Sequence, residues 1–190
     1  MASLREQWRR EAMRRIQQCA LDLFDERGFD AVTIEEIAKA AGVSASSVYR
    51  YFGTKENLVA ADEFTTLTAD ELANIVDPAD PIASLLQAVR RFESGQRDDG
   101  PWRRVRYFFA EPSVRLATLA ELDRAAQRIA PLLAETHGAT QARVMANALV
   151  FGYFGALERW YDDGGQRSIA DYVEEGMAPL RRLWAGDQAS

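Results

Sequence analysis

The sequence predicts an all-α protein. Apolar residues recur at helical spacing through most of the 190 residues, glycine and proline fall where helices would end, and no stretch shows the sustained alternation of a β-strand. Because 47% of the residues are hydrophobic, the chain can bury one good core, or two smaller cores that share a helix. We therefore expect one or two domains. The helical segments placed below number about nine.

The first helix is expected over residues 4–27. The apolar residues of its buried face follow the spacing i, i+4, i+7 and i+8, and they are Ile16, Ala20, Leu23 and Phe24. Gly28 comes next, and glycine commonly supplies the left-handed residue after a helix end.

Two short helices and the start of a fourth follow. In the run Thr33-Ile34-Glu35-Glu36, the Thr33 hydroxyl and the Glu36 carboxylate have the spacing of a capping box, which begins the second helix. Gly42 suits a tight turn, and Ser44 suits the cap of a short third helix. Thr54 then opens the fourth helix.

The rest of the chain also reads as helices, separated by prolines or by polar turns. They are expected near 58–74, 82–96, 102–110, 114–136, 140–161 and 168–184. Pro131 lies inside one of these segments, so we expect it to kink or split that helix.

Composition excludes several classes of protein. No run approaches the ~20 apolar residues of a membrane span, and the first residues do not resemble a secretory signal, so we expect a soluble, cytoplasmic protein without a membrane partner. The single cysteine, Cys19, and the single histidine, His137, support neither a disulfide nor a zinc site. With no nucleotide-binding glycine loop and no partners for a triad, we expect no enzyme and no cofactor.

The charge distribution constrains contact with a polyanion. The chain carries a net charge of −6, whereas residues 1–60 hold nine basic and nine acidic residues. Any contact with nucleic acid must therefore be local. Five arginines, which are either phosphate contacts or part of a solvated helix face, crowd the first fifteen residues: Arg5, Arg9, Arg10, Arg14 and Arg15.

The second and third helices together fit a helix-turn-helix. The apolar residues that lie where these helices must touch are Ala38, Val43, Val48 and Phe52. The opposite face of the third helix carries Ala45, Ser46, Ser47, Tyr49 and Arg50. Small side chains let this helix approach the bases of a major groove, and Tyr49 and Arg50 are long enough to contact the base edges. A purely structural helical hairpin is the alternative.

Residues 28–38, 41–44 and 49–56 together resemble the TetR family of bacterial transcription regulators. The match spans roughly residues 12–60 and combines a capped helix, a fixed turn, an aromatic cluster and a lysine. It implies binding of double-stranded DNA at a pseudo-palindromic operator, a homodimer formed by the last two long helices, and a small-molecule effector that releases the DNA. Repression is the function the resemblance favours, with activation as an alternative.

The resemblance also assigns residues. It makes Thr33 a phosphate contact and Tyr51 and Lys55 clamps on the DNA backbone. The positions facing the groove, with the cap that begins their helix, are Ser44, Ala45, Ser46, Ser47, Tyr49 and Arg50. Glu35 departs from relatives that contact a base there, since a carboxylate would either repel phosphate or accept from a cytosine amino group. We assign residues 1–54 to DNA binding and 55–190 to effector binding and dimerisation.

The C-terminal part is rich in aromatic residues, most of which are expected in the core. An apolar pocket with a few polar groups would suit a largely apolar ligand. The candidate ligand residues are Phe64, Arg106, Tyr107, Asn147, Phe151 and Phe154. A helical protein that binds small molecules or partners without reading DNA is the alternative function.

A dimer interface is expected where small residues recur at helical spacing and permit close helix approach. The candidates are Ala148, Gly152, Ala156, Trp160, Tyr172, Gly176, Leu180 and Leu183. A four-helix interface would set two recognition helices roughly 34–36 Å apart, or a multiple of that. We expect the fourth helix to transmit ligand binding, since Lys55 lies in its first turn and its far end, near Phe64 and Leu67, should face the pocket.

Overall fold

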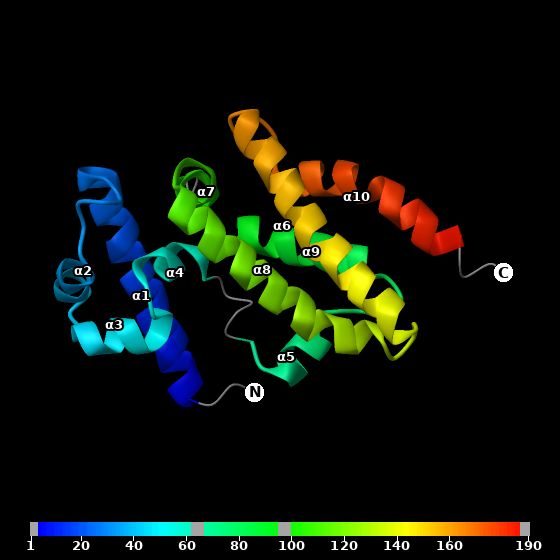
Figure 1. Cartoon of the computed structure of the whole chain (residues 1–190), viewed down its shortest axis with the longest axis horizontal. Helices are drawn as coiled ribbons and strands as arrows, with labels where there is room; N and C mark the ends of the chain where they lie inside the picture. The colour runs from blue at the N-terminus through cyan, green and yellow to red at the C-terminus, as the bar shows by residue number, and fades with distance from the viewer. Residues whose placement is uncertain (1–3, 62–66, 95–99, 187–190) are drawn as a thin grey trace. The chain divides into compact units, whose positions relative to one another are not determined.

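A computed structural model describes residues 4–61, 67–94 and 100–186. These residues form ten α-helices and no strand, which confirms the all-α prediction (Figure 1). The helices are α1 (Leu4–Arg27), α2 (Ile34–Ala40), α3 (Ala45–Phe52), α4 (Lys55–Ala60), α5 (Ala69–Ala73), α6 (Pro81–Ser94), α7 (Gly100–Ala110), α8 (Pro112–Leu133), α9 (Ala139–Asp162) and α10 (Ile169–Gly186).

The described residues fall into two compact units. The first unit contains residues 4–61 and 107–118, and the second contains 67–94, 100–106 and 119–186. Helices α7 and α8 each contribute residues to both units, so the units are interleaved along the chain.

The core of the first unit forms where α1 meets the three short helices. Its buried residues come from every one of these helices, among them Met13, Ile16, Ala20, Phe24, Ile37, Val48 and Leu58. Phe29 folds back so that its ring lies 4.9 Å from the ring of Phe24. Tyr107 packs against both rings, and its hydroxyl donates to Asp25 Oδ1 at 2.6 Å. Burial of these apolar side chains holds α1 to α4 together.

The expected caps of α2, α3 and α4 are confirmed. The Glu36 N–H donates to the Thr33 hydroxyl at 3.3 Å and the Thr33 N–H donates to Glu36 Oε2 at 2.9 Å, which completes the capping box. Ser44 and Thr54 accept in the same way at the next two helix starts. The starts of these short helices are thus fixed by side-chain hydrogen bonds.

The expected continuous helix over residues 58–74 is wrong. Helix α4 ends at Ala60 because Ala61 adopts an extended conformation, with φ −68° and ψ 128°. A separate helix, α5, begins after Thr68, which forms a second capping box with Glu71. A cap of this kind satisfies the donors of a new helix, so it favours a fresh start at Ala69 over continuation.

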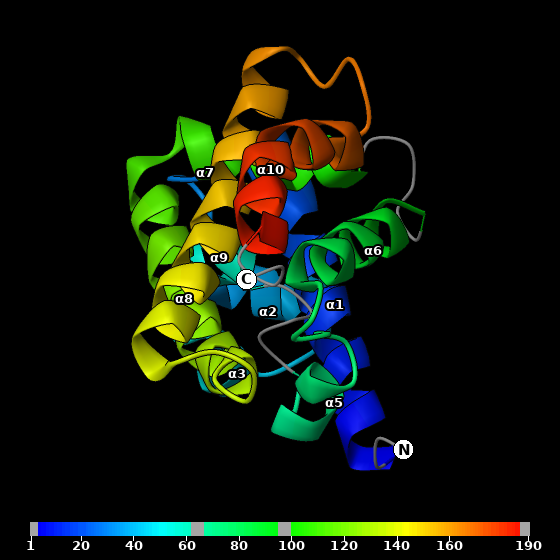
Figure 2. The same cartoon turned by 90° about the vertical axis from the view of Figure 1, so that its right-hand side faces the viewer.

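In the second unit α9 lies between α10 and the later part of α8 (Figures 1 and 2). Buried residues of α5, α8 and α9 form one cluster that includes Leu72, Ala126, Leu133, Met145 and Val150. Helix α8 continues through Pro131 to Leu133, so the expected split there does not occur. Within the described ranges, no helix is both long and apolar enough to cross a membrane.

Candidate nucleic-acid interface

The turn between α2 and α3 is fixed by backbone hydrogen bonds and one glycine. The Val43 N–H donates to the Ala38 carbonyl at 3.0 Å, and the Gly42 N–H donates to the Lys39 carbonyl at 3.2 Å. Gly42 has φ +67°, a left-handed conformation that costs glycine little. After this turn, Val48 and Phe52 of α3 are buried in the core of the first unit.

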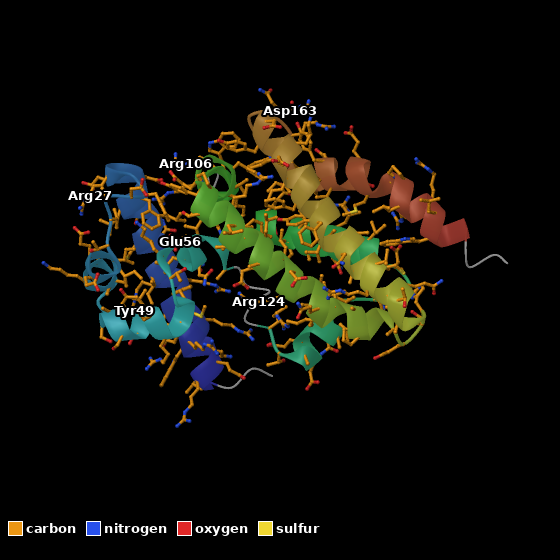
Figure 3. All side chains as sticks on the ribbon, in the orientation of Figure 1. Arg27, Tyr49, Glu56, Arg106, Arg124 and Asp163 are labelled. Carbon is orange, nitrogen blue, oxygen red and sulfur yellow. The ribbon has the colours of Figure 1, made fainter. Side chains whose placement is uncertain are left out.

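The opposite face of α3 is open to solvent. Ser46 and Arg50 are exposed, and 47% of the Tyr49 surface is accessible (labelled in Figure 3). Ala45 and Ser47 on the same helix are half-buried. The structure therefore brings small, hydroxylated and long side chains together on one accessible helix face, the arrangement needed to enter a major groove.

Three serines form a hydroxyl cluster where α3 begins. The exposed Ser44 hydroxyl lies 2.9 Å from the hydroxyl of Ser46 and 2.9 Å from that of Ser47, and it accepts from the Ser47 N–H at 3.2 Å. Each hydroxyl both donates and accepts, so the cluster can exchange an internal bond for one to a base or a phosphate.

Glu35, whose role the sequence left open, lies beside this face. The Tyr49 hydroxyl donates to Glu35 Oε1 at 3.5 Å, and both side chains are exposed. A carboxylate is thus held at the edge of the accessible face of α3. Chemically it can accept from a cytosine amino group, and it disfavours phosphate at the same place.

The side chain and the N–H of Thr33 form hydrogen bonds to another residue of the same chain. Besides accepting from the Glu36 N–H, its hydroxyl donates to Glu36 Oε2 at 2.9 Å, and Arg27 donates to the other carboxylate oxygen at 2.7 Å. The Thr33 N–H, then Arg27, then the Thr33 hydroxyl lower the pKa of Glu36 from 4.5 to about 2. This network fixes the start of α2 next to the open face.

Lys55 also forms hydrogen bonds within the same chain. Its half-buried ammonium donates to the carbonyls of Phe29, at 2.8 Å, and Val32, at 3.1 Å, and lies 4.4 Å from the centroid of the Phe29 ring. It therefore ties α4 to the segment that precedes α2. Its role as a clamp on the DNA backbone stays a prediction.

Arg50 and Tyr51 lie together on the surface of α3. The Arg50 guanidinium lies 5.1 Å from the centroid of the Tyr51 ring, and its Nη2 is 3.5 Å from the Tyr51 hydroxyl. Tyr51 is half-buried, with its ring 6.5 Å from that of Phe52. The contact with the ring orients the guanidinium, and its N–H groups other than those on Nη2 can donate to a further acceptor.

The structure does not gather all the candidate ligand residues. Phe64 lies outside the described residues, and Tyr107 belongs to the first unit, where its hydroxyl bonds to Asp25. The other candidates belong to the second unit: half-buried Arg106 (labelled in Figure 3), half-buried Asn147, exposed Phe151 and buried Phe154. The buried Oδ1 of Asn147 has no hydrogen-bond partner among the described residues, so an acceptor is available there.

Several candidate dimer residues are used within the chain. Ala156, Trp160 and Tyr172 are buried; Trp160 donates to the Arg167 carbonyl, and Tyr172 donates to Asp163. A Cβ added at Gly152 would lie 2.8 Å from the Met177 methyl, so the small residues of α9 seat α10 of the same chain. The remaining candidates keep accessible surface: Ala148, Gly176, Leu180 and Leu183.

A second line of α9 residues was recognised only in part: Ala148 and Phe151 were among the candidates, whereas Val144 and Gly155 were not. Val144 is 61% exposed, Phe151 is 39% exposed and Gly155 is exposed, and with Ala148 they follow the helical spacing i, i+4, i+7 and i+11. Leu183 of α10 is 70% exposed. The helical spacing of these residues is visible in the sequence. It can be recognised as a separate face only when the α9 residues that pack on α10 are known.

The described ranges contain no group of three or more His, Cys, Asp or Glu side chains that could hold a metal ion. His137 Nδ1 lies 2.8 Å from the Thr136 hydroxyl and 3.2 Å from the Leu133 carbonyl, contacts typical of a helix end. Cys19 is a half-buried free thiol, and burial raises its pKa.

Two family models match the chain. Residues 16–61 match the bacterial regulatory proteins of the tetR family, and residues 79–185 match the MftR C-terminal domain. The first match contains α2, α3 and α4, and the second extends from α6 through most of α10.

Curated proteins and solved structures agree with these matches. The chain is 35% identical over 147 residues to an HTH-type transcriptional repressor, Rv3405c, of Mycobacterium tuberculosis, covering 76% of this chain and 73% of the relative. It is 43% identical over 53 residues to the HTH-type transcriptional repressor KstR2 of Rhodococcus jostii, covering 28% and 25%. The fold is similar to NalD, the secondary repressor of the MexAB-OprM multidrug efflux pump in Pseudomonas aeruginosa, with a TM-score of 0.57 and 20% identity over 91% of this chain and 96% of NalD.

Proposed function

The chain belongs to the TetR family of bacterial transcriptional regulators, and from this premise we propose that it is a dimeric repressor that a small-molecule ligand releases from a pseudo-palindromic operator. In this proposal residues 1–54 read the DNA, and residues 55–190 bind the ligand and the second copy.

The observation that carries the proposal is the open outer face of α3. Val48 and Phe52 anchor the helix in the core, while Ser46, Tyr49 and Arg50 face solvent. A surface helix without a binding role more often carries Glu and Lys, which favour helix and solubility. Arg50 can bond the O6 and N7 atoms of guanine, and Tyr49 can contact a thymine methyl group.

Contacts to the DNA backbone would fix the register of α3. We assign Thr33, Tyr51, Lys55 and the Ser44 hydroxyl to this role, with the half-buried Ala45 and Ser47 allowing close approach. For Thr33 and Lys55 this requires exchange of the internal bonds described above for bonds to phosphate. Backbone contacts of this kind position a protein without selecting sequence.

The exposed apolar line on α9 supports the dimer. Val144, Ala148, Phe151 and Gly155 follow one helix face, and Leu183 offers a further apolar side chain on α10. Large exposed apolar residues at regular spacing are typical of an interface. A two-fold axis through this surface would pair two α9–α10 hairpins, and the proposal requires the two copies of α3 in this dimer to reach successive major grooves.

The effector site is proposed in the second unit, next to Asn147. A buried amide oxygen without a partner costs folding free energy unless a ligand or a water satisfies it. An effector that is largely apolar but carries one N–H or O–H donor would fit this group, with Phe154 as an apolar neighbour on the same helix. A ligand that favours one dimer geometry by about 1–3 kcal/mol changes operator occupancy about 5- to 150-fold.

Selection from random duplex DNA tests the proposal. The full chain is mixed with a pool of random duplexes, the retained DNA is sequenced, and affinity is then measured by gel shift. We expect an inverted repeat, and at least about a tenfold loss of affinity for the double variant Tyr49→Ala/Arg50→Ala. Arg124→Ala is the control, because Arg124 is exposed on α8 in the second unit and pairs with Glu121.

The outcomes separate the rival functions. No enrichment of any sequence, together with a stable dimer, would favour a helical ligand-binding protein that does not read DNA. Equal affinity of the Tyr49/Arg50 variant and the control would mean that α3 is not the reading element. A monomer at micromolar concentration would remove the two-fold operator from the proposal.

A further inference from the structure

Helix α1 is longer than its packing requires. The first buried residue of α1 is Met13, so residues 4–12 extend the helix for about two and a half turns before it enters the core. Figure 1 shows this N-terminal end of α1 continuing past α3. Leu4 and Trp8 are more than 60% exposed there. Two large apolar side chains of this end of the helix are therefore left accessible to solvent.

The extension is basic in an acidic chain. Residues 4–15 carry five arginines and two glutamates, whereas the whole chain has a net charge of −6. Positive charge at a helix N-terminus is disfavoured by the helix dipole. Arg5, in the first turn, is therefore unfavourable for α1 itself, and the charge of this segment suits an anionic partner.

Two of the arginines continue the packed face of the helix. Met13, Ile16, Ala20 and Phe24 bury one face of α1 with steps of three or four residues, and the same steps taken toward the N-terminus reach Arg9 and Arg10, and then Arg5 and Glu6. Arg5 and Arg9 are exposed, whereas Glu6 and Arg10 are half-buried. At 3.6 residues per turn, Leu4, Trp8 and Arg15 fall on the opposite, outward side of the helix.

The face of α1 that packs on the helix-turn-helix thus changes, where the helix leaves the core, from apolar residues to three arginines and one glutamate. Because this end of α1 runs past α3 (Figure 1), the exposed Arg5 and Arg9 are candidates to meet an anion that lies beside α3. The phosphate backbone is the anion present there when α3 enters a groove.

We infer that Arg5 and Arg9 bind DNA phosphates that flank the groove entered by α3, so that α1 is a second DNA-contacting element. This inference rests on the proposed DNA-reading function. Guanidinium groups at i and i+4 lie about 6 Å apart along the helix, which suits phosphates that follow one another on a strand.

The salt dependence of DNA binding tests the inference. Each phosphate contact contributes about 0.9 to the slope of log Kobs against log salt concentration. Two contacts in each subunit predict that the slope of an Arg5→Gln/Arg9→Gln dimer is shallower by about 3.6, measured on duplexes selected from the random pool by the unmodified chain. The preferred sequence stays the same, because phosphate contacts carry no sequence information.

A matched variant removes the same charge elsewhere. Arg15→Gln/Arg91→Gln changes two exposed arginines, one on the outward side of α1 and one on α6. We expect its slope to change by less than about one unit, since Arg15 lies on the outward side of α1 and Arg91 belongs to the second unit, outside the proposed DNA-reading part. Thermal unfolding of both double variants should match that of the unmodified chain, because all four residues are exposed.

Equal slopes for the two double variants would overturn the inference while leaving the DNA-reading function intact. A shallower slope together with a changed preferred sequence would also overturn it, because the arginines would then contact bases. Failure of the unmodified chain to bind any DNA would overturn both the proposed function and this inference.

Discussion

Replacement of Lys55 by methionine distinguishes two roles for this side chain. In the structure its ammonium donates to the carbonyls of Phe29 and Val32, which join α4 to the segment before α2. Hydrogen bonds to a charged donor contribute about 1.5–3 kcal/mol each, but a half-buried site lets water replace part of them. We therefore expect Lys55→Met to lower the free energy of unfolding by about 2 kcal/mol. For a chain of this length that lowers the Tm by about 4–8 °C.

The assay is thermal unfolding followed by circular dichroism at one protein concentration, since dimer formation makes the Tm depend on concentration. Lys39→Met is the matched control, because Lys39 is an exposed lysine of α2 in the same unit, and its Tm should change by less than about 1 °C. An unchanged Tm for Lys55→Met, with weakened DNA binding, would refute the reasoning and make Lys55 a phosphate clamp alone.

Three further outcomes are expected. Phe151→Glu should convert the dimer to monomer in sedimentation experiments while the helix content stays the same, because Phe151 is exposed in the single chain; a persistent dimer would place the interface elsewhere. Because the pKa of Glu36 is about 2 in the folded chain and 4.5 in the reference state, its stabilising contribution is complete above pH 4.5 and is lost as the pH falls toward 2. The fall in Tm between about pH 5 and pH 3 should therefore be smaller for Glu36→Gln than for the unmodified chain, and equal falls would contradict this assignment. Glu35→Gln should relax any preference for cytosine at one operator position, since an amide also offers donors to other bases; an identical selected sequence would show that Glu35 reads no base.

Local signals in the sequence were sufficient for the first three helices and for the start of the fourth. Caps and turns depend on contacts between residues three or four apart, so Thr33, Gly42 and Ser44 could be assigned from spacing alone. The capping box at Thr68 carries the same signal. It was overlooked because residues 58–74 contain no glycine or proline, the residues that marked the other helix ends.

Contacts between distant residues could not be predicted in this way. Nothing near Tyr107 in the sequence indicates that its hydroxyl meets Asp25, which lies 82 residues earlier. The small residues of α9 correctly indicated close helix approach, but a pattern does not distinguish a helix of the same chain from a helix of a second copy. In the structure, Met177 of α10 lies against Gly152.

The interleaving of the two units limits how regulators of this type can be recombined. Residues 107–118 pack with the first unit although they follow the whole of α5 and α6 along the chain. A chimaera joined at residue 54 would pair Asp25, Phe24 and Phe29 with a foreign side chain in place of Tyr107. Exchange of sensing modules between relatives should therefore succeed only when the Tyr107 segment travels with the N-terminal helices, or when the donor supplies an equivalent tyrosine.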